Sequence, residues 1–76
     1  MTITRTHHTA TCQTFRVSLS AYHEDVITAE YDADMRWVAI ERNGDLVACY
    51  ECPRGWAIDI SRVAKRAIRE VYGLDR

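Results

Sequence analysis

Two cysteines separated by two residues, Cys49 and Cys52, are the most obvious candidates for chemistry in this sequence. A Cys-x2-Cys followed by a Pro-Arg-Gly turn resembles one zinc knuckle, and zinc prefers four nitrogen or sulfur ligands in a tetrahedron. Cys12 and a histidine, for which we take His8, would have to complete the site. Because the sequence has no second Cys-x2-Cys, the competing interpretation is that both cysteines are small buried or half-buried hydrophobes. Zinc is therefore the alternative, and the sequence predicts no cofactor.

The remaining reactive residues do not form a catalytic pattern. His7, His8 and His23 have no nucleophile at a recognisable spacing, and the three glycines are isolated rather than gathered in a phosphate-binding loop. A redox Cys-x-x-Cys needs to open a helix to lower the thiol pKa, whereas this pair ends a predicted strand. We therefore expect no catalytic residues and a protein that is not an enzyme.

Acidic residues recur with strand spacing in the middle of the chain. Glu30, Asp32 and Asp34 alternate, and Glu24 and Asp25 precede them. Alternate strand residues project from one face about 6.5–7 Å apart, close to the spacing of successive phosphates along a nucleic-acid strand. Such a row would fit a groove lined by Lys and Arg on another protein. The competing interpretation is a solvated strand face that charge keeps from aggregating.

Basic residues occupy the outer face of a predicted C-terminal helix, at Arg62, Lys65, Arg66 and Arg69. This face would bind phosphates or an acidic partner, or it is a solvated surface whose later bases suit the helix dipole. No aromatic residues are interleaved with the bases, which weakens the case for direct nucleic-acid binding.

The composition bounds the class of protein. A chain of 76 residues suffices for one domain, and its net charge is −1. The acids are concentrated in residues 24–59 and the C-terminal segment is basic, which argues against a simple nucleic-acid binder. The N-terminus has no apolar run and no segment approaches the ~20 apolar residues that span a bilayer. With three cysteines and no secretion signal, we expect a cytoplasmic protein with free thiols.

The elements that position these residues begin after a Thr- and His-rich start. Residues 1–10 are predicted to be a flexible tail or an edge strand, and residues 11–76 a single α+β domain. Two stretches alternate with the two-residue period of half-buried strands; their apolar positions are Phe15, Val17 and Leu19, then Ile27, Ala29 and Tyr31. A helix over Ser20–Asp32, capped by Ser20, is the alternative for the second stretch.

A β-hairpin is the clearest local prediction. Met35–Arg42 and Asp45–Cys52 flank Asn43-Gly44, the preferred pair for a two-residue type I′ turn. Pro53-Arg54-Gly55 is expected to end the hairpin. The predicted cross-strand pairs are Arg42 with Asp45, Ile40 with Val47, Val38 with Cys49, Arg36 with Glu51, Trp37 with Tyr50, and Ala39 with Ala48.

A helix is predicted to follow, with Asp59 or Ser61 as its N-cap and Gly73 as its left-handed C-cap. Leu74 is expected to fold back onto Ile68. An apolar stripe recurs at helical spacing at Ile60, Val63, Ala64, Ala67, Ile68 and Val71. The fold class is thus α+β: an antiparallel sheet of three to four strands packed against one C-terminal amphipathic helix.

The hairpin is apolar on both faces, and one helix covers only one of them. The larger apolar face is assigned to the helix and comprises Met35, Trp37, Ala39, Leu46, Ala48 and Tyr50. The smaller face would remain as an interface patch for a partner or a homodimer, formed by Val38, Ile40, Val47 and Cys49. The alternatives are that residues 1–10 cover this patch or that the two faces are reversed.

In size and style the chain resembles small accessory proteins of phages and mobile elements of the anti-CRISPR type. The resemblance is carried by length, by the acidic row at Glu30, Asp32 and Asp34, and by the lack of catalytic motifs. It implies a non-enzymatic inhibitor that binds a protein partner, a larger nucleic-acid-handling complex. The alternatives are a zinc-stabilised binding module built on Cys49 and Cys52 and a nucleic-acid binder that uses the basic helix.

Overall fold

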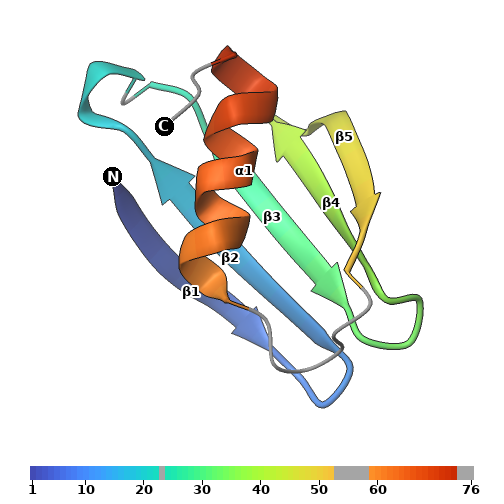
Figure 1. Ribbon diagram of the computed structural model, residues 1–76. Helices are drawn as coiled ribbons and strands as arrows, with labels where there is room; N and C mark the ends of the chain where they lie inside the picture. Colours follow the sequence, from blue (N-terminus) through green and yellow to red (C-terminus); the bar gives the residue numbers. More distant parts are fainter. Residues whose placement is uncertain (23, 53–58, 74–76) are drawn as a thin grey trace.

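The computed structural model describes residues 1–22, 24–52 and 59–73 and has an α+β fold. Five antiparallel strands form one sheet, and a single C-terminal helix packs against it (Figure 1). The strands are β1 (Thr2–His8), β2 (Cys12–Ser18), β3 (Ile27–Asp32), β4 (Trp37–Arg42) and β5 (Asp45–Glu51). The helices are the short 3₁₀ turn η1 (Ser20–Tyr22) and α1 (Ile60–Tyr72). The predicted class is confirmed, with five strands rather than three to four.

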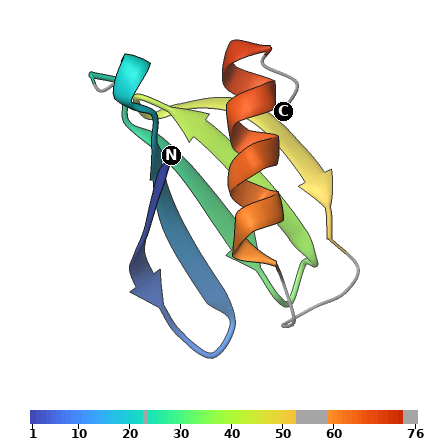
Figure 2. The ribbon, with the colours of Figure 1, turned by 60° about the vertical axis from the view of Figure 1, so that its left-hand side comes forward.

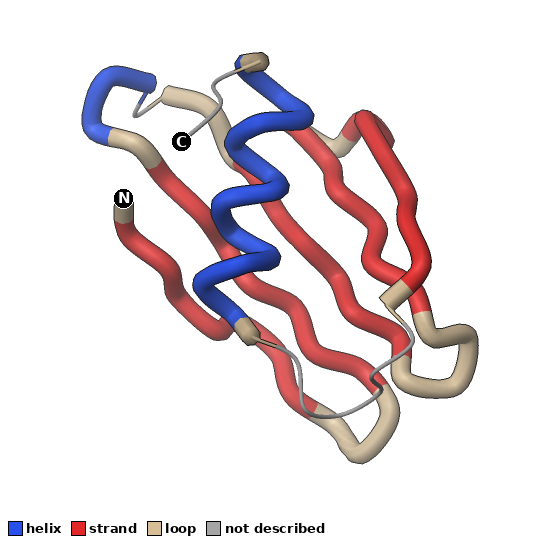
Figure 3. The backbone as a smooth tube through the Cα atoms, viewed as in Figure 1, coloured by secondary structure: helices blue, strands red, loops and turns tan. Residues whose placement is uncertain are grey.

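The sheet is a simple meander in which each strand pairs with the next one in the chain (Figure 3). The additional strand is β1, because the Thr- and His-rich start pairs with β2 at the edge of the sheet. The register of this pair shifts between Arg5 and His7, and such a bulge twists an edge away from further strand pairing. β5 forms the opposite edge.

The residues at the ends of α1 explain its bounds. Asp59 is the N-cap, and its Oδ1 accepts hydrogen bonds from the backbone N–H of Ser61 at 3.0 Å and of Arg62 at 3.4 Å. At the other end Gly73 adopts φ 69°, and its N–H donates to the carbonyl of Arg69. Asp59 is thus the cap rather than Ser61, while the prediction for Leu74 lies outside the described residues.

The core lies between α1 and one face of the sheet. The helix contributes the predicted stripe, of which Val63, Ala64, Ala67 and Ile68 are buried. The sheet side consists of alternating residues from β2, β3 and β4 that are at most 1% exposed, namely Phe15, Val17, Ile27, Ala29, Tyr31, Val38 and Ile40. Figures 1 and 2 show α1 lying along this face, and none of the described elements packs on the other face.

The predicted assignment of the β4 faces is wrong. Val38 and Ile40, expected in an exposed patch, are 0% exposed beneath α1, whereas Trp37 is 42% exposed. Val38 pairs with Tyr31 and Ile40 with Ala29, so alternation along β4 places both on the side of these buried residues. The register of β5 then shifts: Glu41 pairs with Leu46 but Ile40 pairs with Ala48, which leaves Val47 without a partner. This bulge moves every later pair by one residue.

The bulge also regroups the apolar residues of the hairpin between its two faces. Val38 pairs with Tyr50 and Ile40 with Ala48, so these four residues share the helix side. The predicted pairs Ile40–Val47, Val38–Cys49, Arg36–Glu51, Trp37–Tyr50 and Ala39–Ala48 are therefore wrong. Only the pair beside the turn, Arg42 with Asp45, is confirmed.

The turn itself has the predicted geometry. Asn43 and Gly44 adopt φ 52° and 88°, the two positive values that a type I′ turn requires. Asn43 has a second role, because its Oδ1 accepts a hydrogen bond from the N–H of Val26 at 2.9 Å. The turn is thereby tied to the chain just before β3.

The alternative helix over Ser20–Asp32 does not form, since η1 is the only helical segment among the described residues of this range and β3 begins at Ile27. The Pro53-Arg54-Gly55 stretch lies outside the described residues. Within the described part of the chain, no helix has the length and apolar character needed to cross a membrane.

Candidate interaction surface

The sheet face opposite α1, here called the open face, is the main candidate functional surface. Side chains alternate along a strand, so the neighbours of each buried residue project to this side. The open face includes Cys12, Thr14 and Arg16 of β2, Thr28, Glu30 and Asp32 of β3, Trp37, Ala39 and Glu41 of β4, and Leu46, Cys49 and Glu51 of β5. The surface is therefore built on rigid strands rather than on loops.

The apolar part of the open face lies over β4 and β5. Trp37 is 42% exposed and Leu46 66%, and Val47 at the bulge is 41% exposed. Met35, in the turn before β4, is also exposed. A domain of this size has little apolar material to spare, so large exposed side chains that are grouped indicate a contact surface.

One row of the open face places an aromatic residue between two acidic residues. Asp32 of β3 pairs with Trp37 of β4, which in turn pairs with Glu51 of β5. Directly opposed residues have Cβ atoms about 4.5–5.5 Å apart, so the two acids flank the indole. An indole face attracts cations, and a guanidinium or ammonium group bound there would also meet carboxylate acceptors. The row therefore suits a basic side chain of a partner.

Negative charge dominates the open face. Its strand residues include the acids Glu30, Asp32, Glu41 and Glu51 and one arginine, Arg16. The thiol of Cys12 reports this environment, because desolvation first, and then the nearby carboxylates of Glu30 and Asp32, raise its pKa. This thiol is therefore kept neutral rather than activated.

The predicted acidic row is divided by the structure. Glu30 and Asp32 lie on the open face, while Asp34 lies in the turn that follows β3. Asp32 also has a structural role, since its Oδ1 accepts hydrogen bonds from the backbone N–H of Asp34 at 2.9 Å and of Met35 at 3.1 Å. Glu24 and Asp25 lie beyond the opposite end of β3. The row is therefore not a continuous phosphate mimic along one strand.

Instead, the acids spread across strands. Glu41 and Glu51 join Glu30 and Asp32 only when β4 and β5 fold beside β3. The sequence analysis did not include Glu41 or Glu51 among the acidic candidates, and it placed Trp37 under the helix. The face of Trp37 follows from the pairing of β4 with β3, which no local pattern in the sequence indicates.

Asp25 belongs to a structural cluster at the C-terminal end of α1. Its carboxylate accepts hydrogen bonds from the Tyr72 hydroxyl at 2.6 Å, from Arg42 at 3.2 Å and from Asn43 at 3.2 Å. The Tyr72 ring also stacks on Tyr22, with centroids 4.1 Å apart. The hydrogen bond from Tyr72, then that from Asn43, lower the pKa of Asp25. Asp25 is therefore part of the scaffold rather than of the open face.

The basic helix residues lie on the side of α1 away from the sheet. Arg62, Lys65 and Arg69 are exposed. Arg66 differs, because its guanidinium lies 4.1 Å from the Tyr50 ring centroid and its Nε lies 3.3 Å from Glu70. Arg66 therefore covers the core beside β5, and the basic face is smaller than the sequence pattern indicates.

The candidate metal ligands are not brought together. Cys12 and Cys49 lie on the open face, in β2 and β5, while Cys52 packs against the core on the helix side. Cys49 and Cys52, three residues apart in extended chain, point to opposite sides, and His8 lies on the helix side of β1 opposite Gln13. No cluster of three or more potential metal ligands occurs in residues 1–22, 24–52 and 59–73.

Comparison with known proteins returns no relative: no family model, no curated protein and no solved structure matches this chain. The geometry of the open face therefore carries the functional argument.

Proposed function

We propose that this protein is a non-enzymatic interaction protein that binds a basic protein surface through the open face. The observation that carries the proposal is the Asp32–Trp37–Glu51 row, in which an exposed tryptophan pairs with an acidic residue on each neighbouring strand. The exposed Leu46 and Val47 supply apolar contact next to this row. An aromatic anchor with apolar neighbours and a charged rim is the usual anatomy of an interface.

The partner that best fits this chemistry is a larger nucleic-acid-handling complex. Surfaces that bind nucleic acid are lined by Lys and Arg, and they often contain aromatic or apolar positions for bases. Glu30, Glu41 and Glu51 would contact the Lys and Arg side chains of such a surface. Trp37 would take the place of a stacked nucleobase or bind a guanidinium group. Occupying that groove would exclude the nucleic acid, which is the inhibitory mode that the anti-CRISPR resemblance implies.

The experiment is capture of the partner by charge-matched variants. Purified protein with an affinity tag is used to recover proteins from its host, and the affinity of each captured protein is then measured. Glu30→Lys and Glu51→Lys should each weaken binding by about tenfold or more, because like charges would face each other across the interface. Glu24→Lys makes the same charge change at an exposed site outside the open face and should leave the affinity unchanged.

Nucleic-acid competition completes the test. The proposal expects that DNA or RNA bound by the partner displaces this protein, and that the Trp37→Ala variant is displaced more readily. An equal loss of affinity for the partner in Glu24→Lys and Glu51→Lys contradicts the proposal. Simultaneous binding of this protein and of DNA or RNA to the partner also contradicts it. Circular dichroism of each variant checks that the fold is unchanged.

A further inference from the structure

The outer edge of β5 is a sheet edge that borders the open face. In Figures 1 and 2, β5 lies at the margin of the sheet, and no described element pairs with its outer side. Such an edge presents backbone N–H and C=O groups that can pair with a further strand. Residues 48–51 keep a regular register with β4, because the bulge at Val47 lies nearer the start of β5. This stretch of the edge therefore has the geometry that strand addition needs.

The hydrogen-bond pattern identifies which backbone groups point away from β4. The N–H of Cys52 donates to the carbonyl of Arg36 at 2.7 Å, so the backbone groups of Cys52 are directed toward β4. This direction alternates along an antiparallel strand, because hydrogen-bonded and non-hydrogen-bonded pairs alternate. Tyr50 is therefore also bonded to β4, whereas the N–H and C=O groups of Cys49 and Glu51 point outward. The side chains of these two outward residues project to the open face.

The side chains along this edge favour a strand in which basic and apolar residues alternate. A residue added opposite Glu51 would lie in the same row as Trp37, so a Lys or Arg at this position would pair with the exposed Glu51 carboxylate. The alternate residues of the added strand would project to the helix side. There they would lie beside the half-buried Ala48 and Tyr50, where apolar side chains fit.

A second copy of this chain fits the same edge less well. Pairing two β5 strands would bring two Asp45 and two Glu51 side chains to one seam, and all of these residues are exposed acids. Like charges across paired strands are unfavourable. The charge of β5 therefore favours a basic segment of another protein over self-association.

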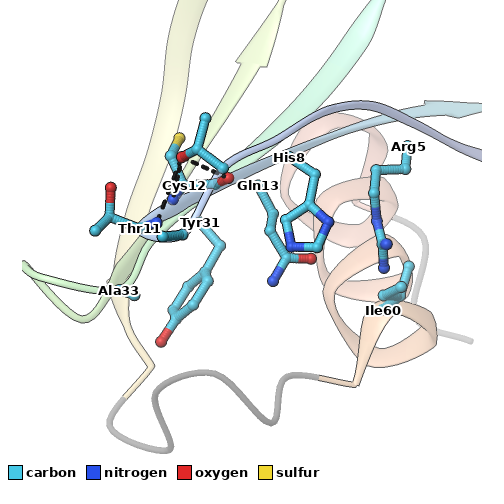
Figure 4. Close-up of a pocket in the computed structure, with 10 residues that line it drawn as sticks. Arg5, His8, Thr11, Cys12, Gln13, Tyr31, Ala33 and Ile60 are labelled. Carbon is cyan, nitrogen blue, oxygen red and sulfur yellow. Dashed lines mark hydrogen bonds between the residues drawn. The ribbon is translucent and has the colours of Figure 1, made fainter.

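The opposite edge of the sheet is also less suited to a basic strand. β1 has a bulge between Arg5 and His7, and Arg5 would repel an added basic residue. Figure 4 shows Arg5 and His8 on the helix side near Ile60 of α1, where they line a pocket. Of the two edges, β5 is therefore the one that combines a regular backbone with complementary charge.

We propose that the partner of the open face presents an extended basic segment that adds to the sheet beside β5. This inference rests on the proposed function, since it specifies the form in which the basic surface is bound. Backbone hydrogen bonds to Cys49 and Glu51 supply affinity, and the alternate Lys or Arg side chains supply specificity for the acidic open face.

The test is amide hydrogen exchange of the ¹⁵N-labelled full chain, measured by NMR with and without a synthetic peptide of alternating arginine and valine. Exchange of the Cys49 and Glu51 N–H groups should slow by about tenfold or more at saturating peptide, because both groups gain hydrogen-bond acceptors. A peptide of the same length with glutamate in place of arginine should protect neither group. Equal protection by the two peptides overturns the proposal.

A proline variant tests the backbone contact separately from the charge. Cys49→Pro removes an outward N–H without removing a hydrogen bond to β4, and proline is tolerated at such positions of edge strands. It should weaken affinity for the arginine–valine peptide by about tenfold, whereas Cys49→Ala keeps the N–H and should bind as wild type does. Circular dichroism checks the fold, and the exchange measurement on wild type decides if Cys49→Pro does not fold. Equal affinities of folded Cys49→Pro and Cys49→Ala overturn the proposal.

The exchange measurement also separates this inference from the proposed function. Saturable shifts of the Trp37 indole without slower exchange at Cys49 and Glu51 would overturn strand addition and leave binding by the open face intact. Slower exchange at the same two amides that needs no peptide and increases with protein concentration would identify a second copy as the occupant, which overturns the basic segment. No shift at Trp37 together with no protection at β5 would overturn both proposals.

Discussion

The Tyr72 hydroxyl donates a 2.6 Å hydrogen bond to the Asp25 carboxylate, across 47 residues of sequence. This contact joins the last turn of α1 to the loop before β3, and Arg42 and Asn43 bring the β4–β5 turn to the same carboxylate. The end of the helix is thereby fixed to two connections of the sheet. This cluster helps to hold α1 on one face of the sheet, and the open face on the other side therefore remains uncovered by the helix.

Acid should weaken the Asp25 cluster selectively. The folded state lowers the pKa of Asp25 below its ordinary value of 3.8. A depressed pKa stabilises the folded state above pH 3.8, and that stabilisation is lost as pH falls through the folded-state pKa. Urea unfolding should therefore show wild type more stable than Asp25→Asn at neutral pH, with the difference shrinking below pH 3.8.

Glu24→Gln is the matched control, because Glu24 is the exposed acid next to Asp25. It should follow the wild-type pH profile. If the difference in unfolding free energy between wild type and Asp25→Asn stays constant down to the lowest pH, the carboxylate charge is not what stabilises the cluster.

High pH should weaken the same contact, because deprotonation of Tyr72 removes the proton that it donates to Asp25. Burial first, and then the hydrogen bond that it donates to Asp25, raise the pKa of Tyr72 from 10.0 to about 12. A raised folded-state pKa means that the stabilisation is complete below pH 10.0 and is lost as pH rises toward about 12. The stability difference between wild type and Tyr72→Phe should therefore narrow over this range. Denaturant midpoints measured at increasing pH check it, and a difference that widens would contradict the assignment.

The β4–β5 bulge predicts opposite responses at two neighbouring aliphatic residues. Ile40→Ala should lower the free energy of unfolding by about 2–5 kcal/mol, because it opens a cavity beneath α1 where Ile40 is 0% exposed. Val47→Ala should lower the free energy of unfolding by about 0.5 kcal/mol or less, because Val47 is exposed at the bulge. Equilibrium unfolding in urea measures both. Similar costs for the two variants would restore the bulge-free register in which these residues pair.

Local sequence signals predicted the parts of the fold that depend on neighbouring residues. Asn43-Gly44 determines its own turn through positive φ, and Asp59 and Gly73 bound the helix through their own hydrogen bonds. The buried helix stripe followed from its spacing alone. These features form within a few residues of chain, so composition and spacing are sufficient to predict them.

The features that sequence did not predict depend on partners distant in the chain. The bulge at Val47 is decided by which face of β4 meets α1, and both registers satisfy the pair of Arg42 with Asp45. The acidic part of the open face needs β3, β4 and β5 in their final order before Glu51 lies near Asp32. The role of Asp25 similarly depends on Tyr72, which no local pattern connects to it.

The most direct test of the central claim is an NMR titration of the ¹⁵N-labelled protein with an arginine-rich peptide, with the Trp37 indole assigned by a Trp37→Phe variant. The account predicts saturable shifts of that indole N–H and of the β3, β4 and β5 amides around Asp32 and Glu51, with α1 amides unaffected. An acidic peptide of the same length should produce none. Shifts confined to α1, or no saturable shift at Trp37, would contradict the claim that the open face binds a basic partner.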